Sequence, residues 1–155
     1  MIARELMQTD APTLSPEDPI QLAAELLTHY EHSDIAVLDE DGRIIGMVGE
    51  DDILALALPT AAAELGTLSY LPRCYGLRDL SDEKLQELTV GDIMRTEDFV
   101  VVEEDELAAE AALLMMRHHQ PQIFVERDGR YVGRLGRKHI ISELVDPHLG
   151  VACHP

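Results

Sequence analysis

Basic residues are scarce in this chain of 155 residues: 12 Lys and Arg stand against 30 Asp and Glu, which gives a formal net charge of −18 at pH 7. A charge of this size and sign repels a phosphate backbone and an anionic membrane surface over most of the molecule. The sequence therefore argues against general binding to nucleic acids and against electrostatic docking on membranes.

Cysteines and long apolar runs are also nearly absent. The two cysteines, Cys74 and Cys153, are far apart and do not have the spacing of metal ligands, which fits a reducing compartment. The longest apolar runs, such as 54–58 and 111–116, are far shorter than the roughly 20 residues of a membrane-spanning helix. Because residues 1–5 do not resemble a signal peptide, we expect a cytoplasmic protein without a membrane segment.

Aromatic residues make up only 4% of the chain, and there is no Trp. A planar ligand would therefore be held mainly by aliphatic walls and backbone groups. The hydrophobic content of 46% is nevertheless enough for one sizeable core or two small ones. The sequence contains no phosphate-binding Gly-Lys-Ser/Thr loop, dinucleotide-binding glycine pattern, nucleophile elbow or His-Glu-x-x-His motif. We therefore expect no enzymatic activity and no required cofactor.

An internal repeat organises the chain. Aligned at an offset of 87 without gaps, residues 2–58 are identical to residues 89–145 at 14 of 57 positions, whereas unrelated sequences agree at roughly one position in sixteen. The identical pairs include turn glycines, such as Gly42 and Gly129. The sequence therefore predicts two duplicated structural units.

Each copy has the residue pattern of an αβαββα unit. Apolar residues recur at helical spacing in three segments, and short apolar runs flank an Asp-Gly turn that is typical of a hairpin. In the first copy, the predicted elements are 3–7, 13–14, 20–30, 35–38, 44–48 and 50–58. In the second copy, they are 90–94, 100–102, 105–118, 123–125, 131–132 and 137–144.

A sheet of three short strands with helices on one face leaves its other apolar face exposed to water. We therefore predict an α/β (α+β) fold in which the two units pack sheet against sheet with pseudo-two-fold symmetry. The predicted parts are a first unit at 1–58, a partly helical connecting segment at 59–88, a second unit at 89–147 and a C-terminal tail at 148–155.

Two motifs resemble those of a known family, the CBS domain, a regulatory module named after cystathionine β-synthase. Residues 90–94 resemble its opening Val-x-Asp-Ile-Met, and residues 42–54 resemble its Gly-x-h-h-Gly-h-h-Ser/Thr-x-x-Asp-h-h motif, where h is hydrophobic. The resemblance implies two clefts between the repeats that bind adenosine ligands such as AMP, ADP, ATP or S-adenosylmethionine. It also implies a homodimer formed through helices, and a regulated enzyme or transporter as partner.

The resemblance further implies roles for residues of the first copy. Asp52 stands where the Asp of the family hydrogen-bonds the ribose hydroxyls, and Thr13 and the backbone around Ile35 would lie near the base. Gly49 occupies the position of the Ser or Thr that contacts phosphate. In the second copy, His139 replaces the Asp, so the first cleft is the better-preserved nucleoside site.

The helical turn after each glycine has opposite charge in the two copies. Glu50-Asp51-Asp52 follow Gly49, and the first copy carries two basic and 13 acidic residues, a net charge of −11. In the second copy, the equivalent Gly136 is followed by Arg137, Lys138 and His139, and that copy carries seven basic and 11 acidic residues, a net charge of −4. Because a helix start attracts anions, we expect the second cleft to tolerate phosphate better.

Two other functions stay open beside the leading one. The lack of the Ser or Thr hydroxyl that contacts phosphate in the family, and the acidic first cleft, suit a different function. This is a nucleotide-independent dimerisation or interaction scaffold with vestigial pockets. The carboxylates of Glu50, Asp51 and Asp52 suit a divalent-cation sensor. The leading hypothesis is a regulatory CBS pair that binds an adenosine ligand in its first cleft and signals to a partner.

Overall fold

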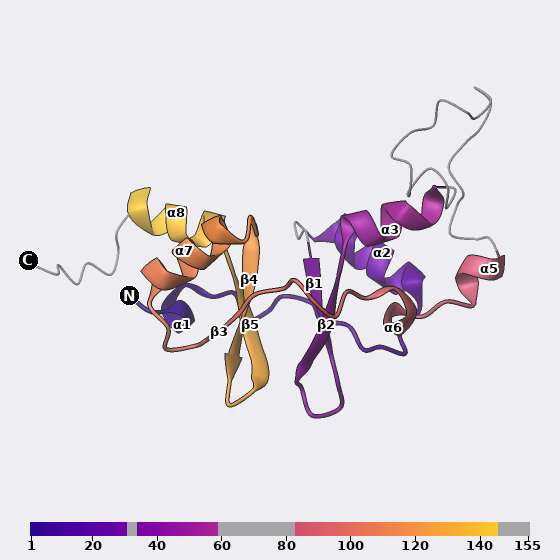
Figure 1. Cartoon of the computed structure of the whole chain (residues 1–155), viewed down its shortest axis with the longest axis horizontal. Helices are drawn as coiled ribbons and strands as arrows, with labels where there is room; N and C mark the ends of the chain where they lie inside the picture. Colours follow the sequence, from indigo (N-terminus) through magenta and orange to yellow (C-terminus); the bar gives the residue numbers. More distant parts are fainter. Residues whose placement is uncertain (31–33, 59–82, 146–155) are drawn as a thin grey trace, which may run out of the picture.

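The computed structural model describes residues 1–30, 34–58 and 83–145, and these residues form two halves that lie side by side (Figure 1). Most of the predicted connecting segment, 59–82, and the predicted tail, 148–155, lie outside the described residues. The described end of the connecting segment, which the sequence predicted to be partly helical, contains the short helix α5 (Glu83–Gln86).

The first half contains a hairpin covered by two helices. Its elements are α2 (Ile20–His29), β1 (Asp34–Leu38), β2 (Ile44–Gly49) and α3 (Glu50–Ala57). The turn between the strands uses Gly42, whose φ of +80° is accessible to glycine at little cost. The extended piece predicted at 13–14 is less regular than expected, because only Leu14 pairs with β1, in a single parallel bridge to Val37.

The second half has the same plan with one more regular strand. Its elements are β3 (Val101–Glu103), α7 (Ala108–Arg117), β4 (Gln122–Arg127), β5 (Arg130–Gly136) and α8 (Arg137–Val145). Strand β3 runs parallel to β4, and β4 runs antiparallel to β5. Helix α7 begins later than its predicted start at 105, because the backbone turns before Ala108, whose N–H donates to the carbonyl of Met1.

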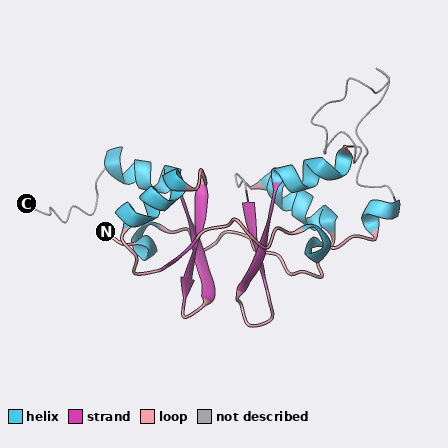
Figure 2. Ribbon diagram, viewed as in Figure 1, coloured by secondary structure: helices cyan, strands magenta, loops and turns pink. Residues whose placement is uncertain are grey.

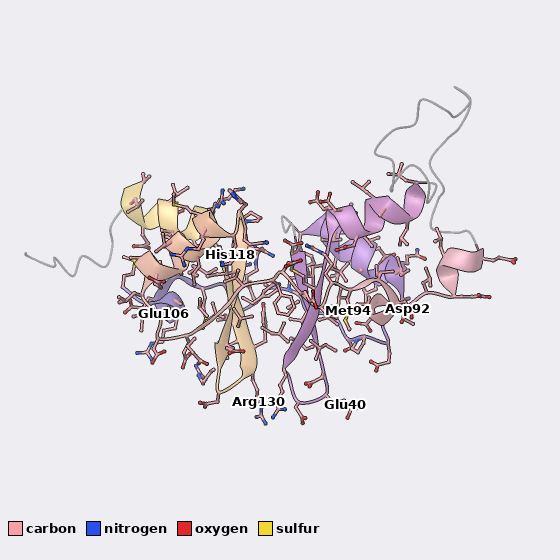
Figure 3. All side chains as sticks on the ribbon, viewed as in Figure 1. Glu40, Asp92, Met94, Glu106, His118 and Arg130 are labelled. Atoms are coloured by element: carbon pink, nitrogen blue, oxygen red, sulfur yellow. The ribbon has the colours of Figure 1, made fainter. Side chains whose placement is uncertain are left out.

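The first helix of each copy packs on the opposite half, which the sequence did not predict. In α1 (Ala3–Leu6), the N–H of Ala3 donates to the carbonyl of Glu106 at 2.8 Å. In α6 (Val90–Ile93), the N–H of Val90 donates to the carbonyl of Asp18 at 2.8 Å. Figure 3 shows this exchange, with Glu106 close to α1 and Asp92 close to the first half. The two copies therefore interlock and form one folding unit.

Each half has an apolar core between its sheet and its helices, and each core includes the exchanged helix. The core of the first half consists of Leu14, Ala23, Ile35, Val37, Val48 and Val90. The core of the second half consists of Ala3, Val102, Ala111, Met115, Ile123, Val125 and Leu135. Because Val90 and Ala3 come from the opposite copy, neither core is complete without both copies.

A third core lies between the two sheets and confirms the predicted sheet-against-sheet packing. Figure 2 shows the strands of the two halves facing each other, with the helices on the outer sides. Ala36 and Met47 of the first half are buried against Phe124 of the second. The ring of Phe124 contacts those of Phe99 and Tyr131 edge to face, at centroid distances of 6.2 Å. Burial raises the pKa of Tyr131 to about 12.

Two equivalent glycines allow the linkers between the halves to cross the strands closely. A Cβ atom on Gly46 would lie 2.8 Å from the Sδ of Met94, and one on Gly133 would lie 2.7 Å from the carbonyl oxygen of Gln8. Figure 3 shows Met94 beside β2. A larger residue would push each linker away from its strand, and these linkers carry residues of the two clefts.

Candidate ligand-binding clefts

The two clefts lie where a strand passes directly into a helix, at α3 in the first half and at α8 in the second. The N–H of Gly49 donates to Oδ2 of Asp52 at 2.7 Å, and the N–H of Gly136 donates to Nδ1 of His139 at 3.0 Å. The two side chains thus cap their helices from equivalent positions. Sequence reasoning expected a ligand role for both residues and did not foresee the capping.

The second cleft contains a cavity of about 700 Å³, a size in the range of small-molecule sites. Its lining combines both halves: Gln8, His29, Tyr30, Pro121, Gln122, Arg134, Gly136, Arg137, Lys138 and His139. Among these described residues there is no Asp or Glu, whereas three of the 12 Lys and Arg of the chain line the cavity. In a protein of net charge −18, this cavity is a local basic site.

Arg134 forms part of this lining and is held by neutral amides. Its Nε and Nη2 donate to Oε1 of Gln8 at 3.0 and 2.8 Å, and its Nη1 donates to Oε1 of Gln122. The residue is only 9% exposed, and burial lowers the pKa of its guanidinium, which nevertheless stays charged at neutral pH. Because both partners are uncharged, they fix the side chain without cancelling its charge.

The environment of His139 favours the neutral form of its imidazole. Burial, with a further contribution from the charge of Arg134, lowers the pKa of its imidazole below the ordinary value of 6.5. Since Nδ1 accepts the N–H of Gly136, the proton of the neutral ring belongs on Nε2, where it can act as a donor. The cleft therefore combines cationic groups with a neutral hydrogen-bond donor.

Arg137 and Lys138, the basic pair from which the sequence predicted better tolerance of phosphate, both line the cavity and are exposed. The Nε and Nη2 of Arg137 donate to the carbonyl oxygens of Gln120 and Met115 at 3.1 and 3.3 Å. This side chain therefore fastens the start of α8 to the end of α7, a role that the sequence did not predict. Both residues nevertheless belong to the lining of the cavity.

The first cleft is much smaller and is crossed by an ion-pair network. Its cavity of about 270 Å³ is lined by Asp34, Glu50, Asp51, Arg95, Gln120 and Pro121. The Nη2 of Arg95 lies 2.8 Å from Oδ1 of Asp34, and its Nε lies 3.1 Å from Oδ2 of Asp52. Burial raises the pKa of Asp34 in spite of the neighbouring Arg95. The carboxylate predicted to hold a ribose is thus engaged by an arginine.

The structure does not bring the predicted first-cleft residues together around this cavity. Thr13, Ile35, Gly49 and Asp52 are not among the residues that line it. Ile35 is buried in the core of the first half, because its side chain faces the helices, and Thr13 is exposed. Their ligand roles stay predictions, and the geometry favours the second cleft.

Sequence reasoning missed three polar residues that shape the clefts: Gln8, Gln122 and Arg95. A comparison of the two copies position by position could have found them. At the offset of 87, Gln8 is equivalent to Arg95, and Gln122 is equivalent to the apolar Ile35. A polar residue at a strand position that is apolar in the other copy indicates a local, copy-specific function.

Two features of the described residues bear on the remaining functions. In residues 1–30, 34–58 and 83–145, no three His, Cys, Asp or Glu side chains come together in a way that could hold a metal ion. In the same part of the chain, no helix has the length and apolar character needed to cross a membrane. The carboxylates proposed for a cation sensor therefore do not form such a cluster there.

Comparison with known families gives a match in both copies. The family model of the CBS domain matches residues 3–58 and 90–146. A homoserine O-acetyltransferase from Methanohalobium evestigatum is 40% identical over 52 residues, which are 34% of this chain. This chain covers only 11% of the length of that enzyme.

Solved structures share the fold at low sequence identity. A CBS domain-containing protein of unknown function from Kribbella flavida has a TM-score of 0.77 and is 20% identical, with 94% of this chain and 99% of that chain covered. CBSX2, solved in complex with AMP, has a TM-score of 0.68 and is 22% identical, with 93% of this chain and 96% of that chain covered. These similarities extend over nearly the whole length of each chain.

Proposed function

Starting from the fact that the chain belongs to the CBS domain family, we propose that it is a regulatory module that binds a phosphate-bearing adenosine ligand, such as AMP, ADP or ATP, in its second cleft. One observation carries this proposal: the cavity of about 700 Å³ lined by three cationic residues and by no described carboxylate. The AMP complex of CBSX2 supports the ligand class, because that protein has the same fold.

The residues of the second cleft suit the parts of such a ligand. Lys138 and the first turn of α8 offer positive charge and backbone N–H groups to the phosphate. The Nε2–H of His139 and the guanidinium of Arg134 offer donors to the ribose oxygens. Tyr30 and Pro121 offer flat and apolar surface to the base. In this arrangement, the cationic groups recognise the phosphate and the apolar wall recognises the nucleoside.

The first cleft suits such a ligand less well. Asp34, Glu50 and Asp51 line its cavity, and Arg95 is already paired with two carboxylates. A phosphate would therefore meet net negative charge in a space less than half as large.

S-Adenosylmethionine has no phosphate with which the cationic residues of the second cleft could pair. It is therefore the weaker candidate for that cleft.

Binding in the second cleft would be communicated through the helices that border it. The cavity touches the start of α8 and the end of α2, at His29 and Tyr30, so a ligand would connect the two halves. A ligand shifts a conformational equilibrium only through its different affinities for the two states. We propose that the affected surface is the outer side of α7 and α8, where Met116 and Leu144 are exposed, and that this side forms a homodimer or contacts a regulated enzyme or transporter.

Isothermal titration calorimetry with AMP, ADP, ATP and S-adenosylmethionine tests the proposal. We expect saturable binding of at least one phosphate-bearing ligand. Lys138→Asp, which introduces the residue found at the equivalent position of the first copy, should weaken it at least tenfold, because a charge-assisted hydrogen bond contributes about 1.5–3 kcal/mol. The matched control Asp51→Asn, in the first cleft, should leave the affinity unchanged.

Two outcomes would contradict the proposal. No heat with any of the four ligands, together with no thermal stabilisation, would favour the interaction scaffold with vestigial pockets. Saturation at 100 times the dissociation constant should raise the free energy of unfolding by about 2.7 kcal/mol. Thermal unfolding would therefore detect binding even where the heat of binding is small. Equal effects of Lys138→Asp and Asp51→Asn would show that the ligand does not depend on the second cleft.

A further inference from the structure

The hairpin turns of the two halves border a cavity that belongs to neither cleft. This cavity of about 570 Å³ is lined by Arg43 of the first half and by Arg127, Asp128, Arg130, Tyr131 and Val132 of the second. Because the turn precedes β5 and α8 follows it, the cavity lies at the opposite end of β5 from the second cleft. Figure 3 shows Arg130 at this end of the second hairpin and Glu40 at the same end of the first.

A backbone hydrogen bond joins the two turns at this cavity. The N–H of Tyr131 donates to the carbonyl of Gly42 at 2.9 Å. Arg43 directly follows Gly42 and Arg130 directly precedes Tyr131, so the two arginines come to the same cavity from opposite halves. They are also equivalent residues of the two copies at the offset of 87. The packing of the halves therefore brings two like charges together.

The protein does not neutralise these two guanidinium groups. Arg43 and Arg130 are exposed, and in the part of the chain that the structure describes neither side chain takes part in a hydrogen bond or an ion pair. Asp39 of the first turn instead accepts the backbone N–H groups of Asp41 and Arg43, each at 2.9 Å. Like charges at one cavity repel each other. In a chain with 30 Asp and Glu, such a pair is a local inconsistency of the kind that functional sites show.

A third arginine distinguishes the second turn from the first. Arg127 stands where the first copy has Glu40, so a basic residue replaces an acidic one at this position. Its Nε and Nη2 donate to the carboxylate of Glu104 at 2.6 and 2.7 Å, which fixes the side chain at the cavity. The described lining carries three positive charges and the one negative charge of Asp128. The balance stays positive even when Glu104 is counted.

We propose that this cavity, the hairpin-turn site, binds a small molecule with two or more oxyanion groups, a polyphosphate or a polycarboxylate. Guanidinium groups bind phosphate and carboxylate through paired N–H donors, and Arg43 and Arg130 offer one such group from each half. The volume of about 570 Å³ lies in the range of small-molecule sites. A ligand here would hold the two turns together at the end of the molecule away from the clefts. This site does not depend on the proposed function.

Backbone amide chemical shifts on titration with sodium pyrophosphate and, separately, with sodium citrate test this site, at an ionic strength held constant with sodium chloride. We expect saturable shifts at residues 42–43 and 127–132. Arg130→Gln should raise the dissociation constant at least tenfold, because it removes a charge-assisted contact, and Arg43→Gln should do the same from the other half. Arg117→Gln is the matched control, since it makes the same charge change at an exposed residue of α7 outside the lining.

The outcomes distinguish this site from the second cleft. Tighter binding of pyrophosphate would identify phosphate groups as the ligand chemistry, and tighter binding of citrate would identify carboxylates. Shifts at 42–43 and 127–132 that do not saturate, or that Arg117→Gln weakens as much as Arg130→Gln, would overturn the site, because they would report only on total charge. Shifts confined to residues 136–139 would overturn it as well. Binding of AMP is followed at 136–139 alone, so failure of the hairpin-turn site does not imply failure of the proposed function.

Discussion

Replacement of Phe124 by Ala should destabilise the whole molecule, because this ring is the centre of the packing between the two halves. Phe124 is 3% exposed and lies against Ala36 and Met47 of the opposite sheet. Its ring also makes edge-to-face contacts with those of Phe99 and Tyr131, at centroid distances of 6.2 Å. The variant would remove these contacts and leave a cavity between the sheets.

The magnitude follows from the surroundings of the ring. Replacement of a buried Phe by Ala generally costs about 3–5 kcal/mol. Phe99 and Tyr131 are only partly buried and can move into part of the cavity, so we expect the lower end, about 3 kcal/mol. At roughly 2–4 °C per kcal/mol for a domain of this size, Tm should fall by about 6–12 °C. Phe124→Leu keeps most of the apolar volume and loses mainly the aromatic pairs, so it should cost about 1–1.5 kcal/mol.

Urea denaturation followed by far-ultraviolet circular dichroism measures these changes. We expect one cooperative transition in every variant, because the exchanged helices α1 and α6 interlock the halves. Leu54→Ala serves as the control: this side chain lies on α3, outside the proposed dimer surface on α7 and α8, is 54% exposed, and should change the free energy of unfolding by less than about 0.5 kcal/mol. An effect of Phe124→Ala as small as that of Leu54→Ala, or two separate transitions, would refute packing of the halves into one unit.

Two further predictions concern pH and assembly. Because the folded state lowers the pKa of His139, its contribution to stability is present above the unfolded pKa of about 6.5 and is lost as the pH falls below it. His139→Asn keeps a capping acceptor that does not titrate. The free energy of unfolding of the wild type relative to this variant, measured by urea denaturation, should therefore decline between pH 7.5 and 5.5. A difference that stays constant over this range would contradict the lowered pKa of His139. Leu144 is 78% exposed on α8, and Leu144→Glu should convert the proposed homodimer into monomers by light scattering. A wild-type chain that is already monomeric would contradict the proposal that this surface forms a homodimer.

Much of the fold could be predicted from the sequence because the chain repeats its pattern. The alternation of apolar residues and the Asp-Gly turns locate the hairpins, and the exposed apolar face of each predicted sheet requires a second sheet. The exchange of α1 and α6 could not be predicted in this way. An apolar helix of four residues fits either half equally well, and its place is decided by backbone hydrogen bonds such as that from Ala3 to Glu106.

The candidate site was less predictable than the fold. The basic turn at Arg137 and Lys138 is visible in the sequence, and the structure places both residues at the second cavity. The ion-pair network of the first cleft depends on Arg95 meeting Asp34 and Asp52, which are 61 and 43 positions away. Such a contact follows only from the crossing of the linker over β2. The position of Asp52 in the family motif therefore led the sequence to favour the first cleft, where the structure pairs Asp52 with Arg95.

A crystal structure of the wild-type protein grown with AMP tests the central claim most directly. We predict AMP in the second cleft, with its phosphate at the first turn of α8 beside Lys138 and its base near Tyr30, while Arg95 still bridges Asp34 and Asp52. AMP bound in the first cleft with Arg95 displaced, or two empty clefts at a saturating concentration, would contradict the claim that the basic second cleft is the nucleotide site.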